Sequence, residues 1–437
     1  MEVLGIGAGV AGLAAARSLC AAGIKVCLLE ARDRVGGRIH TIHGPSLPVP
    51  IELGAEFIHG RPPTIIAIAE KGGLKIQKMP GRHEYWQEGK RVRQDDVFGK
   101  IDEIFERMSD PGLPDQTFSA FLGQINPNQE ARQWATDYVE GFNAARADRI
   151  STRSLAYESR AQQTIGGDRA FRFSQGYHCL VDWLWQECAS CGVILHLDTV
   201  ASTVDWRRGH VEVTARVSTN HSTQHIFSAE RAIITVPLGV LKAPEESPGA
   251  ICFRPQPPSL YAALDQLEMG YATRVTLRFR PGFRELHPAL VESGFIYSSE
   301  DAFPTWWSLP ERPGTRITPG VTGWAGGSKA ERLTGLSDAQ LARRAMKSLA
   351  EIVGARFDAM RKDVEAWYVH NWNADPFARG AYSFARVRGL EARRILSEPV
   401  ENTLFFAGEA ADTEGHAATV HGAIASGQRA AQQILSA

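Results

Sequence analysis

The chain has 437 residues, of which 43% are hydrophobic and 22% are charged, and its formal net charge at pH 7 is −1. A chain of this length and composition is typical of a globular protein with about two to three domains. The near-zero charge offers no electrostatic basis for binding nucleic acid or an anionic membrane, and no apolar run approaches the roughly 20 residues that a membrane-spanning helix needs. We therefore expect a cytoplasmic monomer or homodimer with no nucleic-acid or membrane partner.

Residues 3–6 predict a short buried strand that runs directly into a G-x-G-x-x-G turn at 7–12. An Ala- and Leu-rich helix is expected over 13–22, and a second strand over 24–29 ends at Glu30. In this context the glycines allow a tight turn and close approach of the backbone to a pyrophosphate, and the acid can accept both hydroxyls of a ribose. We therefore favour a dinucleotide site over a plain strand, turn and helix, with the helix N-terminus facing the phosphates.

The next segment, 34–38, reads Arg-Val-Gly-Gly-Arg and extends this motif. Its glycines clear space and its two guanidinium groups can bind phosphate oxygens, although a lone arginine is more often a solvated surface charge. Residues 51–60 then alternate small and large side chains, and a row of small residues lets the backbone lie against a flat ring. Within this segment His59 and Glu56 are candidate substrate contacts, although a structural role is the commoner one for either.

The sequence becomes polar and helix-periodic between residues 62 and 167. Trp134, Tyr138 and Phe142 fall on one helical face there, and core packing is favoured over the wall of a ligand site. The tryptophans between 306 and 372 are likewise expected in the core. Strands are expected at 193–197, 200–204, 211–215, 231–237, 274–279 and 321–325, with an amphipathic helix over 339–353.

The six cysteines are too few to cross-link a chain of this length, so all six are expected to be reduced. Cys188-x-x-Cys191 has no second Cys or His pair nearby. Two ordinary thiols are therefore favoured over a zinc site or redox chemistry, and no metal is expected.

The closing segment has the same order of features as the opening one: a strand, a glycine turn and a helix. An apolar strand is followed by a glycine turn and an acid over 403–410, and a small-residue helix begins at Val420. The N–H groups at the start of that helix can point at an electron-rich acceptor such as a ring carbonyl.

With these segments in view, the chain resembles the flavin-containing amine oxidases, which include monoamine oxidases, polyamine oxidases and lysine-specific histone demethylases. The resemblance covers nearly the whole length. It rests on the opening glycine motif with Glu30, on segments 34–38, 53–60 and 235–241, on Trp372-x-x-Asp375-Pro376 with 380–383, and on 406–409 with 419–423.

The resemblance implies FAD, bound by residues from three parts of the chain. Glu30 would hold the adenosine ribose, Arg38 the pyrophosphate, Val200 the adenine, Glu409 the ribityl-phosphate region and Val420 the pyrimidine edge of the flavin. Other expected cofactor contacts are Gly7, Gly9, Ala11, Gly12, Ala31, Arg32, Gly37, Gly54, Ala55, Glu56, Pro237, Trp372, Gly408 and Thr419. Ala381 falls where monoamine oxidases carry the cysteine that bonds the flavin, so the FAD is expected to be non-covalent.

The fold implied is α/β. A Rossmann-like, glutathione-reductase-like FAD-binding domain would comprise 1–60, 171–245 and 396–437. An inserted α+β substrate domain would comprise 61–170 and 246–395, with 61–170 forming a mainly helical subdomain.

The reaction implied is hydride transfer from an amine to flavin N5, followed by imine hydrolysis to an aldehyde and reoxidation by O2 to give H2O2. An apolar aromatic site would favour the neutral, reactive form of the amine. His59, Arg274, Tyr382 and Thr419 are the expected catalytic residues. Tyr382 would form one wall of the site. Thr419 replaces the second tyrosine of monoamine oxidases, which indicates the branch that contains polyamine oxidases and histone demethylases.

One position departs from the family pattern. Arg274 stands where the family usually has a lysine that holds a water against flavin N5, and a planar, permanently charged guanidinium need not hold the same water. A polyamine or a primary or secondary amine is the expected substrate. An amino-acid oxidase, or a dehydrogenase or desaturase that reacts poorly with O2, remains the alternative, supported also by the lack of an obvious acidic cluster for a polycation.

Overall fold

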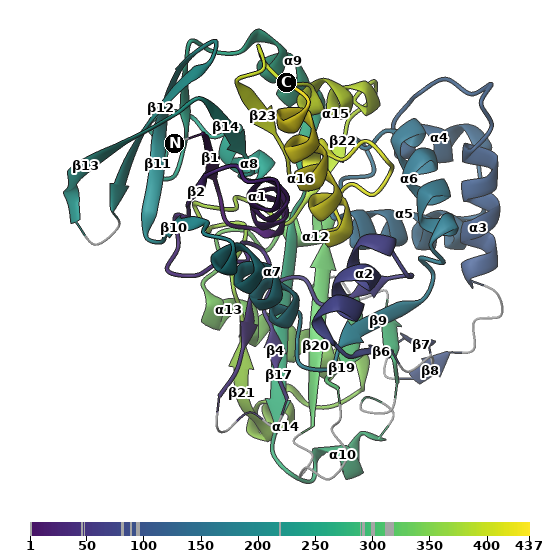
Figure 1. Ribbon diagram of the computed structural model, residues 1–437. Coiled ribbons are helices and arrows are strands. Elements are labelled where there is room, and N and C mark those ends of the chain that lie inside the picture. The colour runs from purple at the N-terminus through teal and green to yellow at the C-terminus, as the bar shows by residue number, and fades with distance from the viewer. Residues whose placement is uncertain are drawn as a thin grey trace.

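The computed structural model describes residues 2–44, 47, 49–79, 83–87, 90–92, 97–217, 220–288, 290, 293–298, 302–310 and 319–437. A five-stranded parallel sheet lies beneath the two chain ends, and its strands come from three separated parts of the chain (Figure 1). In order across the sheet they are β10 (Ile194–His196), β2 (Val26–Leu29), β1 (Val3–Ile6), β14 (Arg231–Ile234) and β23 (Leu404–Phe406).

Alternate residues of this sheet enter two different cores, because successive side chains of a strand point to opposite faces. Val3 and Ile233 belong to a core shared with α1 (Val10–Ala21), α7 (His178–Ser190) and α16 (Val420–Leu435). Leu4 and Ile234 belong to the core on the other face. This second core is shared with four further elements: β11 (Thr199–Arg207), β12 (His210–Val217), α9 (Pro258–Gln266) and α15 (Leu390–Ser397). Both faces of the parallel sheet are therefore covered, as its uniformly apolar strands require.

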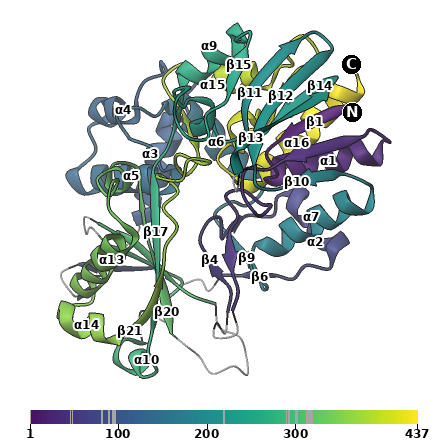
Figure 2. The same ribbon diagram turned by 90° about the vertical axis from the view of Figure 1, so that its left-hand side faces the viewer.

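The other sheets extend from this centre. A four-stranded sheet has the order β13 (Asn220–Ala229), β12, β11 and β15 (Cys252–Arg254). A seven-stranded sheet has the order β21 (Val364–Tyr368), β17 (Ala272–Phe279), β20 (Gly320–Gly326), β19 (Thr305–Ser308), β18 (Phe295–Ser298), β7 (His83–Gln87) and β8 (Lys90–Val92). Figure 2 shows its long strands β17 and β20 extending away from the parallel sheet.

Helices fill the space around the seven-stranded sheet. A helical group, drawn in blue in Figure 1, consists of α3 (Val97–Met108), α4 (Phe118–Ile125), α5 (Gln129–Asn143) and α6 (Thr152–Thr164). The remaining helices are α2 (Pro63–Gly72), α8 (Leu238–Leu241), α10 (Phe283–Leu286), α12 (Gly327–Glu331), α13 (Asp338–Ile352), α14 (Phe357–Asp363) and the 3-10 turn η1 (Glu409–Ala411). The small sheets comprise β3 (Thr41–Ile42), β4 (Ile51–Glu52), β5 (Ile58–His59), β6 (Ile76–Lys78), β9 (Ala170–Phe173), β16 (Leu267–Met269) and β22 (Ser383–Ala385).

The predicted strands and helices are present, with shifted ends. The opening helix begins at Val10 rather than at residue 13, because Gly9 already occupies the N-cap. The expectation that all six cysteines are reduced is wrong for two of them: Cys20 in α1 and Cys191 after α7 form a disulfide. Within the described part of the chain, no helix has the length and apolar character needed to span a bilayer.

Candidate active site

One continuous cavity of about 1420 Å³ runs from the parallel sheet to the helical group. Its lining residues come from both ends of the chain and from the middle. A drug-sized ligand needs roughly 300–1000 Å³, so this cavity can hold a dinucleotide together with a small substrate. All of the residues predicted at the site line it except Gly12 and Arg34.

The nucleotide end of the cavity is built around Glu30, which is 4% exposed. Its carboxylate accepts hydrogen bonds from the Ala8 N–H at 2.8 Å and the Arg32 N–H at 3.0 Å. Burial raises the pKa of Glu30, although those two donors and the Arg32 charge oppose the shift. The two N–H donors fix the carboxylate at the end of β2, where the sequence predicts that it receives the ribose.

Two glycines of the opening turn have different reasons to lack a side chain. A Cβ on Gly12 would lie 2.1 Å from the Gly7 carbonyl oxygen, so Gly12 is required for helix and strand to pack. A Cβ on Gly9 would meet nothing within 4 Å, and Gly9 lines the cavity. No protein atom therefore requires Gly9 to be a glycine, but a ligand lying against its backbone would.

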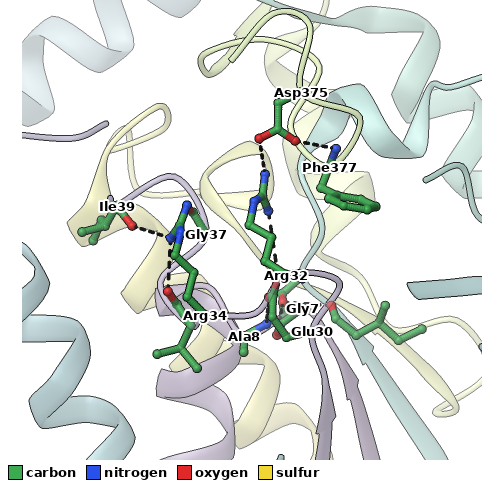
Figure 3. A network of polar contacts seen from close by, with 12 residues as sticks. Gly7, Ala8, Glu30, Arg32, Arg34, Gly37, Ile39, Asp375 and Phe377 are labelled. Carbon is green, nitrogen blue, oxygen red and sulfur yellow. Dashed lines mark hydrogen bonds and ion pairs between the residues drawn. The ribbon is translucent and has the colours of Figure 1, made fainter. Parts of the chain in front are cut away.

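Arg34 corrects the expectation that both arginines of segment 34–38 hold phosphate. Its guanidinium donates to the carbonyl oxygens of Val35, Gly37 and Ile39 at 3.0 to 3.2 Å, and it does not line the cavity (Figure 3). The side chain instead fixes the turn that follows it. The neighbouring Arg32 forms an ion pair with Asp375 at 2.8 Å, which joins the first strands to the loop after β21.

Arg38 and Glu409 connect the opening and closing motifs. Arg38 Nη1 donates to the Ala381 carbonyl oxygen at 2.7 Å and to Glu409 Oε1 at 3.0 Å. Burial acts to raise the pKa of Glu409, but Arg38, Arg393 and Ser383 outweigh it and hold the pKa below its usual range. Glu409 is therefore ionised and fully engaged, while the Arg38 guanidinium also faces the cavity.

Gly54, Trp372 and Val420 line one stretch of the cavity, which we call the slot. A Cβ on Gly54 would lie 1.9 Å from the Arg38 carbonyl oxygen and 3.2 Å from the Trp372 ring, so the backbone and the indole are in close contact. Trp372 is fixed by a 2.7 Å hydrogen bond from Nε1 to the Leu53 carbonyl oxygen. Val420 begins α16 and faces the same cavity.

Tyr382 and Thr419 have their hydroxyls occupied. The Tyr382 hydroxyl donates to the Phe142 carbonyl oxygen at 2.7 Å, and burial raises its pKa, so the phenol stays protonated. The Thr419 hydroxyl donates to the His416 carbonyl oxygen at 2.6 Å and accepts from the Gly422 N–H at 3.0 Å, as an N-cap. Thr419 thus shapes the start of α16, and Tyr382 presents its ring.

Arg274 is also held by protein groups. Its Nη1 donates to the Gly54 carbonyl oxygen at 2.6 Å and its Nη2 to Glu56 at 2.7 Å. Both Arg274 and Glu56 are buried and line the cavity. Glu56, a candidate substrate contact from the sequence, is therefore engaged by Arg274.

The chamber beyond the slot is aromatic, which corrects a sequence expectation. Trp134, Tyr138 and Phe142 of α5 line the cavity, although Trp134 and Tyr138 also pack against neighbouring core residues, and Trp324 and the predicted cofactor contact Trp372 line the cavity too. For the three α5 residues, a helical period shows that a face is covered but not what covers it. Of the other tryptophans expected in the core, Trp306 is buried and Trp367 is 40% exposed.

Two histidines of the chamber are uncharged at physiological pH. His59 packs edge-on against Phe142, and burial lowers the pKa of His59 to about 4. Burial also lowers the pKa of His421 to about 3, and its buried Nε2 has no hydrogen-bond partner among the described residues. The chamber thus offers an apolar surface with few fixed positive charges.

Acidic side chains stand where the cavity reaches α3, and the sequence analysis missed them. Asp102 and Glu106 lie one turn apart on α3, are exposed and line the cavity. Asp137 on α5 also lines it and forms an ion pair with Lys329 at 2.9 Å. The i, i+4 spacing of Asp102 and Glu106 was readable, but on an exposed helix such a pair usually indicates only solvation.

Comparison with known proteins identifies the family. The model of the flavin containing amine oxidoreductases matches residues 10–435. The chain belongs to this family.

Curated relatives cover almost the whole chain. Polyamine oxidase 4 of Oryza sativa subsp. japonica is 28% identical over 465 residues, covering 99% of this chain and 88% of that protein. Probable polyamine oxidase 4 of Arabidopsis thaliana is 30% identical over 455 residues, covering 99% and 86%. Lysine-specific histone demethylase 1 homolog 2 of Arabidopsis thaliana is 30% identical over 465 residues, and the match spans 58% of its length. This amine oxidoreductase is therefore a flavin-dependent enzyme that acts on amines.

Solved structures confirm the predicted α/β fold. Wild-type putrescine oxidase bound to putrescine has a TM-score of 0.81 at 19% identity, covering 100% of this chain and 99% of that one. Cyclohexylamine oxidase from Brevibacterium oxydans IH-35A has a TM-score of 0.80 at 21% identity, covering 100% and 98%.

The residues present in this amine oxidoreductase fit a flavin dinucleotide. The open space at the Gly9 Cβ position, the uncapped N-terminus of α1 and the fixed carboxylate of Glu30 match a nucleotide end. The slot beside Gly54 and Trp372 can hold a flat ring against its wall. Among the described residues, no group of three or more His, Cys, Asp or Glu side chains is arranged to hold a metal ion.

Proposed function

We propose that this enzyme oxidises diamines or polyamines with a non-covalently bound FAD and reduces O2 to H2O2. The observation that carries the proposal is that one cavity joins the nucleotide end, the aromatic chamber and the acidic side chains of α3. The flavin supplies the two-electron acceptor for the C–H bond next to the amine nitrogen, and the product imine is hydrolysed by water.

The protein binds one amino group of the substrate in its neutral form and the other in its charged form. In the chamber, Trp134, Tyr138 and Phe142 penalise an ammonium, so the amine that enters loses its proton and keeps an electron pair to release. Asp102 and Glu106 lie on α3, which packs beside α5, and they attract a second ammonium where the cavity reaches α3. A substrate with two cationic groups separated by an apolar chain satisfies both conditions at once.

Amino acids are disfavoured by the state of Arg274. A carboxylate needs an uncompensated cation with donors directed at it, whereas Arg274 already donates to the Gly54 carbonyl oxygen and to the Glu56 carboxylate, whose charge would repel a second carboxylate. The same hydrogen bonds of Arg274 also affect the reaction of the reduced flavin with O2. A guanidinium held in this way is a poor support for a mobile water, so we expect reoxidation by O2 to be slower than in relatives that carry lysine at this position.

An anaerobic substrate screen tests the proposal. Flavin-loaded protein is mixed without oxygen with putrescine, spermidine, spermine, a simple alkylamine and several amino acids, and the loss of visible flavin absorbance is followed. We expect the polyamines to bleach the flavin faster than the alkylamine. Faster bleaching by an amino acid, or by none of the amines, would contradict the proposal.

A separate measurement tests the mode of FAD attachment. Because Ala381 lies on the cavity wall and no cysteine is among the lining residues that the structure describes, denaturation with acid should leave the yellow colour in the supernatant. Colour that stays with the precipitated protein would refute non-covalent binding.

A further inference from the structure

A buried cluster of three charged side chains stands behind the slot. Glu56 accepts from Arg274 Nη2 through Oε2 at 2.7 Å and from Arg172 Nη2 through Oε1 at 2.7 Å. The side chains of Glu56, Arg172 and Arg274 are 5%, 6% and 4% exposed. Trp307 Nε1 donates to Glu56 Oε2 at 3.0 Å, so the carboxylate has three donors.

The members of this cluster come from four separate elements. Glu56 follows β4, Arg172 lies on β9, Arg274 on β17 and Trp307 on β19. The Arg172 guanidinium also packs over the Phe57 ring at 5.1 Å and donates to the Ser308 carbonyl oxygen at 3.1 Å. Arg172, and Arg274 through Gly54, are therefore held by groups outside the cluster, which fixes their geometry before any ligand enters.

The charges of the cluster do not balance. When the neighbouring Glu52 is protonated, two guanidinium groups share one carboxylate, which leaves one positive charge in a region that is almost closed to water. Arg274 and Glu56 line the cavity, whereas Arg172 does not. A buried charge is screened far less than a surface charge, so it acts strongly on a ring lying against Gly54.

We infer that Glu56 is a positioning residue that sets the reduction potential of the bound flavin by cancelling one of the two arginine charges. The inference depends on a flavin in the slot but not on the identity of the substrate. Two-electron reduction adds negative charge to the ring, and a net positive charge nearby favours that form. Arg172 acts on the ring only through its charge, because it lies outside the cavity wall.

Substitutions of opposite sign separate this role from a structural one. Glu56→Gln preserves shape and raises the cluster charge by one, so the potential should rise and sulfite, which adds reversibly to electron-poor bound flavins, should bind about tenfold tighter. Arg172→Met lowers the charge by one, so the potential should fall and sulfite should bind about tenfold more weakly. Arg172→Lys keeps the charge and should leave both values near those of the wild type.

The conditions and the control follow from the neighbouring groups. Glu52 also acts on the cluster, and burial raises its pKa to about 7, so measurements at about pH 6 keep it mostly protonated. Glu187→Gln is the matched control: Glu187 pairs with Arg17 at 3.1 Å on the surface, where the side chains are 41% and 28% exposed. This variant should change neither the potential nor the sulfite affinity.

Shifts in the same direction for Glu56→Gln and Arg172→Met, or no shift in either, would overturn the inference. If a single variant does not retain flavin, the double variant Glu56→Gln, Arg172→Met decides, because it again carries one net positive charge. A near-wild-type potential in the double variant supports the role of charge, and a shifted one overturns it. Because no amine is used, failure here is distinct from failure of the substrate screen.

Discussion

Exchange of Gly9 for serine should weaken flavin binding without unfolding the protein. Gly9 has φ −69° and ψ 175°, which any residue can adopt, and its Cβ position has no protein atom within 4 Å. Serine is also a good N-cap, so the free energy of unfolding of the flavin-free protein should change by only about 0.5 kcal/mol. The added side chain occupies the space where the backbone would meet a charged phosphate. Losing one or more such hydrogen bonds, each worth about 1.5–3 kcal/mol, should weaken flavin binding by at least roughly tenfold.

Gly12→Ala is the matched contrast in the same turn. Its Cβ would lie 2.1 Å from the Gly7 carbonyl oxygen whether or not flavin is bound, so the flavin-free protein should lose about 3 kcal/mol or more. Denaturant unfolding of both flavin-free proteins and fluorescence titration with FAD give the two quantities. If Gly9→Ser lowers stability as much as Gly12→Ala, or binds flavin like the wild type, the interpretation of Gly9 as a ligand-facing position is refuted.

Three further predictions concern the cavity and its surroundings. The double variant Asp102→Asn, Glu106→Gln should raise KM for spermidine about tenfold and leave KM for a monoamine unchanged, because only the second ammonium of spermidine loses its partners. Steady-state kinetics with both substrates measure the two values. An equal rise in KM for both substrates would contradict this role. Arg274→Lys should increase the rate at which O2 reoxidises the reduced enzyme, measured by stopped-flow mixing. An unchanged or lower rate would contradict the expectation that arginine at this position slows the reaction with O2. Burial raises the pKa of Glu52 in the folded protein to about 7. The protonated Glu52 carboxyl therefore contributes fully to the free energy of unfolding below the unfolded pKa, and this contribution is lost as pH rises through about 7. Relative to Glu52→Gln, the free energy of unfolding of the wild type should therefore fall by on the order of 3 kcal/mol between about pH 4.5 and 7, measured by denaturant titration. Parallel pH profiles of stability for the two proteins would disprove the prediction.

Local chemistry explains which parts of the site were readable from the sequence. Glu30 and the glycines of 7–12 lie within one strand, turn and strand unit, so their roles follow from spacing alone. The closing helix at Val420 was recognised for the same reason. Arg34 was misassigned because the same guanidinium can bind phosphate or backbone carbonyls, and only the path of the turn decides between them.

The rest of the site depends on contacts between distant segments. Arg172 and Glu56 are 116 positions apart in sequence numbering, and nothing local to either indicates that they share a buried ion pair. The wall formed by Tyr138 and Phe142 likewise could not be told from a core face, because the cavity beside it is enclosed by segments from elsewhere in the chain.

The distribution of the parallel sheet along the chain has a consequence for biosynthesis. Its outer strand β23 and the helix α16 that faces the cofactor slot emerge more than 370 residues after the opening turn. A nascent polypeptide on the ribosome therefore carries the first half of a cofactor cradle for most of its synthesis with nothing to close it. Stable acquisition of the flavin therefore waits until β23 and α16 have been synthesised.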